Sequence, residues 1–168
     1  MKEFQTAKMD NLTKVITVIL VIFLPSLALS SFFMEPAKPI VSVFFMLLLV
    51  GVIIFSYGFV PKRIALSASH ILIKNFYGPV LIDFKQIKNL EKIDKTGFNL
   101  RTFGVGGLFG YFGYFNGGDI WYVTNIHKKV KITLYSGQIY MISPEKRDDF
   151  LNLTAQQMNS PVQIKVFP

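Results

Sequence analysis

The chain has 168 residues, of which 51% are hydrophobic and only 17% are charged. Soluble domains carry about 25% charged residues, so this composition excludes an ordinary soluble protein and predicts that part of the chain lies in a membrane. The absence of cysteine excludes disulfides, thiolate nucleophiles and cysteine-based metal sites. The net charge of +8 predicts an anionic partner, which could be lipid headgroups or nucleic acid.

Two long uncharged runs stand near the start of the chain. Residues 15–34 and 39–61 contain 20 and 23 residues, and at about 1.5 Å per residue each run can cross a hydrocarbon core of about 30 Å. Residues 35–38 form so short a connection that the two runs must be antiparallel neighbours. The sequence therefore predicts a transmembrane hairpin that is followed by a domain over residues 62–168.

Lysine and arginine flank the outer ends of both runs, whereas the connecting loop offers only Lys38. By the positive-inside rule both termini are expected in the cytoplasm, with residues 1–14 as a cytoplasmic segment and 35–38 as an external loop. A cleaved signal peptide is the alternative, because the small residues at 28–30 resemble a cleavage site. The long segment before the first run disfavours it, and the second run would still anchor the chain.

After residue 61 the hydrophobic pattern changes to alternation, which is typical of half-buried strands. Turn residues separate the alternating runs and predict an antiparallel meander. Strands are expected around residues 63–68, 71–76, 80–84, 88–94, 120–125, 130–134 and 139–142, with a short last strand around 162–166.

One amphipathic helix is predicted near the C-terminus. Ser143 is typical of a helix N-cap, Pro144 of the first helical position and Glu145 of the first turn. On this helix a stripe of side chains is expected to face the core, formed by Phe150, Leu151, Thr154, Ala155 and Met158.

Four segments together resemble the bacterial PH-domain (pleckstrin-homology-like) family. They are RTFGVGGLFGYFGYF at 101–115, YVTN at 122–125, KKVKITLYSG at 128–137 and ISPEKRDDFL at 142–151. The resemblance covers residues 61–158 and leaves the hairpin outside it. It implies a mainly β, PH-like barrel of six or seven antiparallel strands capped by a C-terminal helix, here in the cytoplasmic (inner) membrane of a bacterium. The family implies this fold far better than a function.

The glycine and aromatic residues of 101–115 permit three interpretations, one of which is disfavoured. A phosphate-binding loop is disfavoured, because no Lys-Ser or Lys-Thr pair and no periodic helix follow the glycines. The favoured interpretation is a bent strand whose aromatic side chains fill the barrel. The alternative is a loop in the lipid headgroup zone, formed by Leu108, Phe109, Tyr111 and Phe112.

Basic residues cluster at one predicted strand start, where Lys128, Lys129 and Lys131 follow each other closely. Arg101, Lys62, Arg63 and Lys74 could lie elsewhere on the same face. A solvated strand face that protects a sheet edge is the simpler interpretation of these residues. An anionic-lipid or phosphate patch is the functional interpretation.

The sequence indicates no catalytic residues, no metal ligands and no cofactor. His70 and His127 are the only histidines, and neither belongs to a metal-ligand motif. Asp148 and Asp149 are adjacent at a helix start, where acids complement the helix dipole but cannot converge on one substrate. No enzymatic activity is expected.

The favoured function is a membrane-anchored binding or scaffolding protein, whose PH-like domain engages protein partners or anionic lipid at the cytoplasmic surface. A structural subunit of a larger membrane complex, or of a homo-oligomer, is the first alternative, since Gly51, Ser56 and Gly58 would allow close helix approach. A membrane-tethered nucleic-acid binder is the second alternative, and the tether makes it less attractive.

Overall fold

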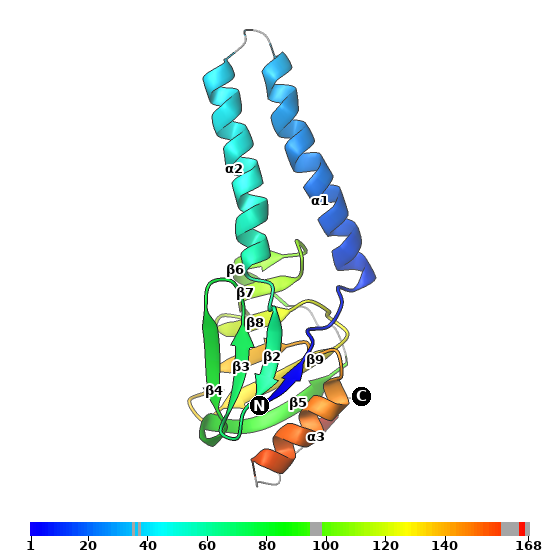
Figure 1. Cartoon of the computed structure of the whole chain (residues 1–168), viewed down its shortest axis with the longest axis vertical. Helices are drawn as coiled ribbons and strands as arrows, with labels where there is room; N and C mark the ends of the chain where they lie inside the picture. Colours follow the sequence, from blue (N-terminus) through cyan, green and yellow to red (C-terminus); the bar gives the residue numbers. More distant parts are fainter. Residues whose placement is uncertain (35, 37, 95–98, 159–164, 167–168) are drawn as a thin grey trace.

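The structure, a computed structural model, describes residues 1–34, 36, 38–94, 99–158 and the backbone of 165–166. A helical hairpin and a β domain that contains one helix follow each other along its long axis (Figure 1). The expected combination of a helical hairpin with a mainly β domain and a C-terminal helix is confirmed.

The hairpin consists of α1 (Asn11–Ser30) and α2 (Pro39–Gly58). The Asp10 side chain caps α1 by accepting a 2.8 Å hydrogen bond from Thr13 N, and the proline that opens α2 has no N–H to satisfy. Both helices are long and apolar enough to cross a membrane, and most of their apolar side chains are exposed.

The two helices lie closest at their far ends and diverge toward the β domain (Figure 1). At the far end Ala28 is fully buried, and the Ser42 hydroxyl donates a 2.9 Å hydrogen bond to the carbonyl of Ser31, in the 3-10 turn η1 (Ser31–Phe33). Small side chains permit this close approach. A Cβ added to Gly51 would meet no atom within 4 Å, so this glycine does not mediate the contact between the helices.

The first sheet is antiparallel, with the order β1 (Lys2–Phe4), β2 (Arg63–Leu66), β3 (His70–Lys74) and β4 (Pro79–Asp83). β1 comes from the N-terminal segment, so the chain enters the β domain before it forms α1. The alternation along β3 buries Ile71 and Ile73.

The second sheet follows the 3-10 turn η2 (Phe84–Gln86) and has the order β11-β5-β9-β10-β8-β7-β6. Neighbouring strands are antiparallel except for β10 with β8 and β11 with β5, which are parallel. The strands are β5 (Ile87–Ile93), β6 (Arg101–Gly106), β7 (Tyr111–Phe115), β8 (Asp119–Val123), β9 (Lys129–Leu134), β10 (Ile139–Ile142) and β11 (Lys165–Val166).

The main hydrophobic core is built from side chains of both sheets and of α3 (Arg147–Gln157). Phe4 of β1 meets Phe150 of α3 edge to face in this core, with ring centroids 5.3 Å apart. A smaller cluster surrounds Trp121 on β8, whose ring stacks on Phe115 at 4.4 Å. The N-terminal segment therefore contributes to the main core of the domain.

The predicted start of the C-terminal helix is wrong, because α3 begins at Arg147 and not after an N-cap at Ser143. The Ser143 hydroxyl accepts a 2.8 Å hydrogen bond from Thr124 N instead, and Pro144 forms a β-bridge with Thr6. Residues 143–144 are held by partners far away in the sequence, and these contacts override the local helix-start pattern.

The strand count also differs from the six or seven expected. Over the described residues there are eleven strands, because the N-terminal segment supplies β1 and the glycine-rich stretch forms the hairpin of β6 and β7. The parallel pairing of β10 with β8 departs from the expected antiparallel meander. Of the last predicted strand, 165–166 form β11, and 162–164 lie outside the described residues.

Candidate functional site

The candidate site is the junction at which the β domain meets the two apolar helices. The tip of the β6–β7 hairpin lies between the helices at their domain end, where they are furthest apart (Figure 1). We call residues 107–110 the hairpin tip. Thr17 of α1 holds it with two hydrogen bonds, one donated by its hydroxyl to Gly107 O at 3.2 Å and one accepted from Phe109 N at 2.8 Å. The Tyr57 ring of α2 contacts the Phe109 ring edge to face, at 5.2 Å.

Glycine makes this hairpin possible. Gly104 and Gly113 face each other across β6 and β7, and a Cβ added to Gly104 would lie 2.1 Å from a carbonyl oxygen of β7. Gly107 and Gly110 have φ of +95° and +151° at the reversal of the chain. Phe109 also has a positive φ, +61°, which is uncommon for a bulky residue and is maintained by its contacts with both helices.

The turn between β3 and β4 caps the C-terminus of α2. Phe76 N donates a 3.1 Å hydrogen bond to Gly58 O, and the Tyr77 hydroxyl donates a 2.7 Å hydrogen bond to Phe55 O. These bonds satisfy carbonyls that have no partner within the helix. The Tyr77 ring lies over Gly58, where an added Cβ would approach it to 2.6 Å, and packs against Phe59 at 4.7 Å. Glycine at this position therefore lets the domain dock onto α2.

The N-terminal segment forms the third connection between hairpin and domain. Ala7 donates its N–H to Ser143 O at 2.8 Å and accepts a 2.6 Å hydrogen bond from the Thr124 hydroxyl. Asp10 caps α1 and also accepts a hydrogen bond from Ile126 N at 3.2 Å. One carboxylate thus joins the first turn of α1 to the β8–β9 loop.

Glu145 also binds the N-terminal segment. Its carboxylate pairs with the Lys128 ammonium and accepts a 2.9 Å hydrogen bond from Lys8 N, while its own N–H donates to Gln5 O. The hydrogen bond from Lys128, and then that from Lys8 N, hold the pKa of Glu145 below its ordinary value.

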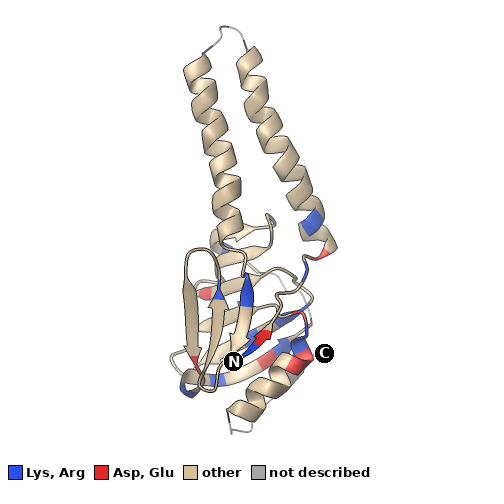
Figure 2. Cartoon of the chain, in the orientation of Figure 1, with Lys and Arg blue, Asp and Glu red and all other residues tan. Residues whose placement is uncertain are grey.

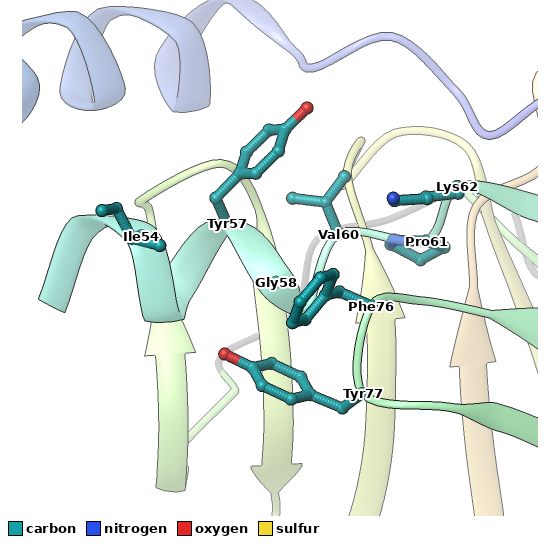
Figure 3. A pocket seen from close by; sticks show the side chains of 8 residues that line it. All are labelled: Ile54, Tyr57, Gly58, Val60, Pro61, Lys62, Phe76 and Tyr77. Atoms are coloured by element: carbon teal, nitrogen blue, oxygen red, sulfur yellow. The ribbon is translucent and has the colours of Figure 1, made fainter. Parts of the chain in front are cut away.

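An apolar cleft of about 480 Å³ opens between the last turn of α2 and the β3–β4 turn. Figure 3 shows its walls, with the Lys62 side chain extending back toward α2 so that the ammonium lies at the rim. That ammonium lies 5.8 Å from the centroid of the Phe76 ring. The cleft is lined by Ile54, Tyr57, Gly58, Val60, Pro61, Lys62, Phe76 and Tyr77.

The four residues proposed for a membrane-contact loop divide between two environments. Phe112 is fully buried, Tyr111 packs against the cluster around Trp121, and Leu108 is buried in the hairpin tip. Phe109 is half-buried between the helices. Part of the stretch thus fills the domain, and the tip contacts the helical hairpin.

The four basic residues proposed for an anion patch do not gather into one free cluster. Lys128 pairs with Glu145, and Lys131 pairs with Glu91 at 3.0 Å. Lys129 is only 1% exposed, with its ammonium 5.5 Å from the Trp121 ring centroid, and burial lowers its pKa. Arg101 lies on the edge strand β6, which β7, β8 and β10 separate from β9. Figure 2 shows acidic residues interspersed among the basic residues of the domain.

The structure groups no metal-binding side chains in the part of the chain that it describes. Among these residues no three His, Cys, Asp or Glu side chains are grouped so that they could hold a metal ion. His70 opens β3 in the first sheet, whereas His127 lies in the β8–β9 loop of the second. What the junction offers chemically is apolar surface, aromatic rings and one cation at the rim of a cleft.

A family model described as bacterial PH domain matches residues 62–158. The chain belongs to the bacterial PH-domain family. The PH domain as matched begins just after α2 and ends at the C-cap of α3, and it includes both sides of the β6–β7 hairpin. β1, α1 and α2 lie outside the match, although β1 completes a sheet of the domain. No curated protein and no solved structure matches the chain.

Sequence reasoning missed the residues that join the PH domain to the helices. Thr17 had a detectable signal, because an isolated hydroxyl within an apolar run tends to face a protein contact. Tyr57 had no such signal, since its neighbours in the cleft come from a turn about 20 residues further along the chain. Lys62 was predicted only as a basic flank of the second run and as part of a basic face.

Proposed function

We propose that the chain is a non-enzymatic, membrane-anchored bacterial PH-domain protein that binds or scaffolds partners at the cytoplasmic surface of the inner membrane. The observation that carries this proposal is the hairpin tip, which Thr17 and Tyr57 hold between two helices with exposed apolar surfaces. An anchor that is docked on its domain in this way sets the distance and the tilt of the domain relative to the membrane.

The N-terminal segment supports the proposed orientation. β1 pairs with β2, so the start of α1 and the end of α2 are both attached to the domain. This arrangement is consistent with a hairpin that crosses the membrane twice. A signal peptide cleaved after Ser30 would remove β1 and Phe4 from the core, which disfavours cleavage. The basic flanks then direct the domain to the cytoplasm.

Single-cysteine labelling tests this topology cleanly, because the chain has no cysteine of its own. Lys38→Cys lies in the connecting loop, and Ser136→Cys lies in an exposed turn of the domain. In intact spheroplasts, an impermeant maleimide should label the first variant and should label the second only after lysis. Equal labelling of both variants in intact spheroplasts, or extraction of the chain from membranes by alkaline carbonate, would contradict the proposal.

An exposed apolar edge supports a protein partner for the domain. β6 is an edge strand, and Phe103 on it is 73% exposed beside Tyr114 of β7 and near Leu100. Exposed apolar edges are frequent sites of strand pairing with another chain. Phe103→Ser should reduce crosslinked adducts of the membrane-embedded chain, whereas Leu81→Ser on the other sheet's edge strand should not.

The same edge favours a second function, that of a structural subunit in a larger membrane complex. In that case the full chain, extracted in mild detergent, should have a stoichiometric partner or a second copy in native mass spectrometry. A chain that is monomeric in detergent but is crosslinked in membranes would instead favour the scaffolding function. Nucleic-acid binding is the least favoured function, because Lys128 and Lys131 already hold carboxylates.

A further inference from the structure

The cleft at the end of α2 lies at a defined depth if the hairpin spans the membrane. α2 has 20 residues, so at about 1.5 Å per residue it is about as long as the hydrocarbon core is thick. Gly58, its last residue, would then stand where hydrocarbon gives way to headgroups. Lys62 follows four residues later, at headgroup depth.

The chemistry of the cleft changes along this direction. Its wall toward the membrane is apolar and continues into exposed side chains of α2, among them Ile54, which is 66% exposed. At the opposite end of the cleft the Lys62 side chain points back toward α2, with its ammonium beside the face of the Phe76 ring (Figure 3). None of the eight described residues that line the cleft is acidic, and Lys62 forms no ion pair with a described residue.

We propose that this cleft binds one anionic phospholipid of the inner leaflet, with the lipid phosphate at the Lys62 ammonium and the start of an acyl chain along Ile54 and Tyr57. The inference rests on the proposed membrane anchoring and goes beyond it. A volume of about 480 Å³ suits part of a lipid, and its apolar wall fits an acyl chain better than a soluble anion. Tyrosines at this depth are typical of the membrane interface.

The binding site is formed jointly by the anchor and the domain. Ile54, Tyr57 and Val60 precede the family match, whereas Lys62 and the β3–β4 turn lie within it. A bound lipid would therefore contact the segment that joins α2 to β2 and would stabilise the docking of the domain.

Native mass spectrometry of the full chain, titrated with lipids of identical acyl chains, tests the proposal. We expect one saturable phosphatidylglycerol adduct with an affinity at least about tenfold higher than that for phosphatidylcholine. Both lipids carry a phosphate, but in phosphatidylcholine a quaternary ammonium compensates its charge and repels the Lys62 ammonium, whereas the charge of phosphatidylglycerol is uncompensated. Lys62→Gln should remove this preference. Lys14→Gln, which loses the same charge at the base of α1 outside the cleft, should retain the preference within about twofold.

A second variant, Ile54→Trp, fills the apolar wall and should weaken the adduct although Lys62 is intact. Equal affinities for the two lipids, or equal losses in Lys62→Gln and Lys14→Gln, would overturn the proposal. Lysine-dependent binding of inorganic phosphate alone, with no lipid preference, would also overturn it. The maleimide and carbonate experiments report membrane insertion separately. An inserted chain without a preferred lipid would therefore refute lipid binding in the cleft but not the proposed membrane anchoring.

Discussion

Replacing Thr17 by valine should loosen the hairpin tip from α1. Valine has nearly the shape of threonine but cannot hydrogen-bond, and Thr17 is only 6% exposed. Its hydroxyl accepts from Phe109 N at 2.8 Å, and losing that acceptor would leave a sheltered amide without a partner, at a cost of about 1–3 kcal/mol. The longer bond to Gly107 O contributes about 0.5–1.5 kcal/mol. We therefore expect a loss of about 2–4 kcal/mol.

The assay is chemical denaturation of the full chain in detergent, followed by near-UV circular dichroism of the buried Trp121. Hydrogen exchange of the Phe109 amide provides a local measurement, and it should accelerate. Ser26→Ala is the matched control, because its hydroxyl bonds only to Ile22 O within the same helix. If Thr17→Val changes stability and exchange no more than Ser26→Ala does, the tip is not fastened by Thr17.

Three further results are expected. Gly104→Ala should destabilise the β6–β7 hairpin by at least about 2 kcal/mol, because its φ is +124° and its Cβ would meet a carbonyl of β7, whereas Gly118→Ala has open space and should be neutral in the same denaturation assay. Phe4→Ala should cost about 3 kcal/mol, by the same assay, since it empties part of the core. The pKa of Glu145 is lowered in the fold, chiefly by Lys128, so its contribution to stability is present above its ordinary pKa and is lost as the pH falls through the lowered pKa. Amide protection of the N-terminal segment should fall in that acid range in the parent and should depend on pH less in Glu145→Gln.

Local patterns in the sequence were sufficient for the elements whose partners are close in the chain. Period-two alternation identified β3 and β4, which pair across a four-residue turn, and β9 and β10, which pair in the same way. The uncharged runs identified α1 and α2, because uniform apolarity needs no partner to be recognised. In these elements the hydrophobic pattern of the sequence agrees with the secondary structure that the chain adopts.

Such local patterns did not predict contacts between residues that are far apart in the sequence. β1 is only three residues long, and it is a strand because Arg63–Leu66, about 60 positions away, offers an edge to pair with. Ser143 has the local signature of a helix N-cap, but its hydroxyl is used by Thr124. The ion pairs of Lys128 and Lys131 were beyond prediction for the same reason, because Glu145 and Glu91 come from other segments.

The three connections at the junction act on the same quantity, the position of the helices relative to the domain. Thr17 fixes α1 to the hairpin tip, Tyr77 fixes the end of α2, and Asp10 fixes the start of α1 to the β8–β9 loop. A segment limited to the family match would lose β1, Phe4 and the partners of the hairpin tip, and would expose core that these residues cover. The smallest unit expected to fold in its native form therefore includes the hairpin and the N-terminal segment, and binding by the domain should be measured on the full chain.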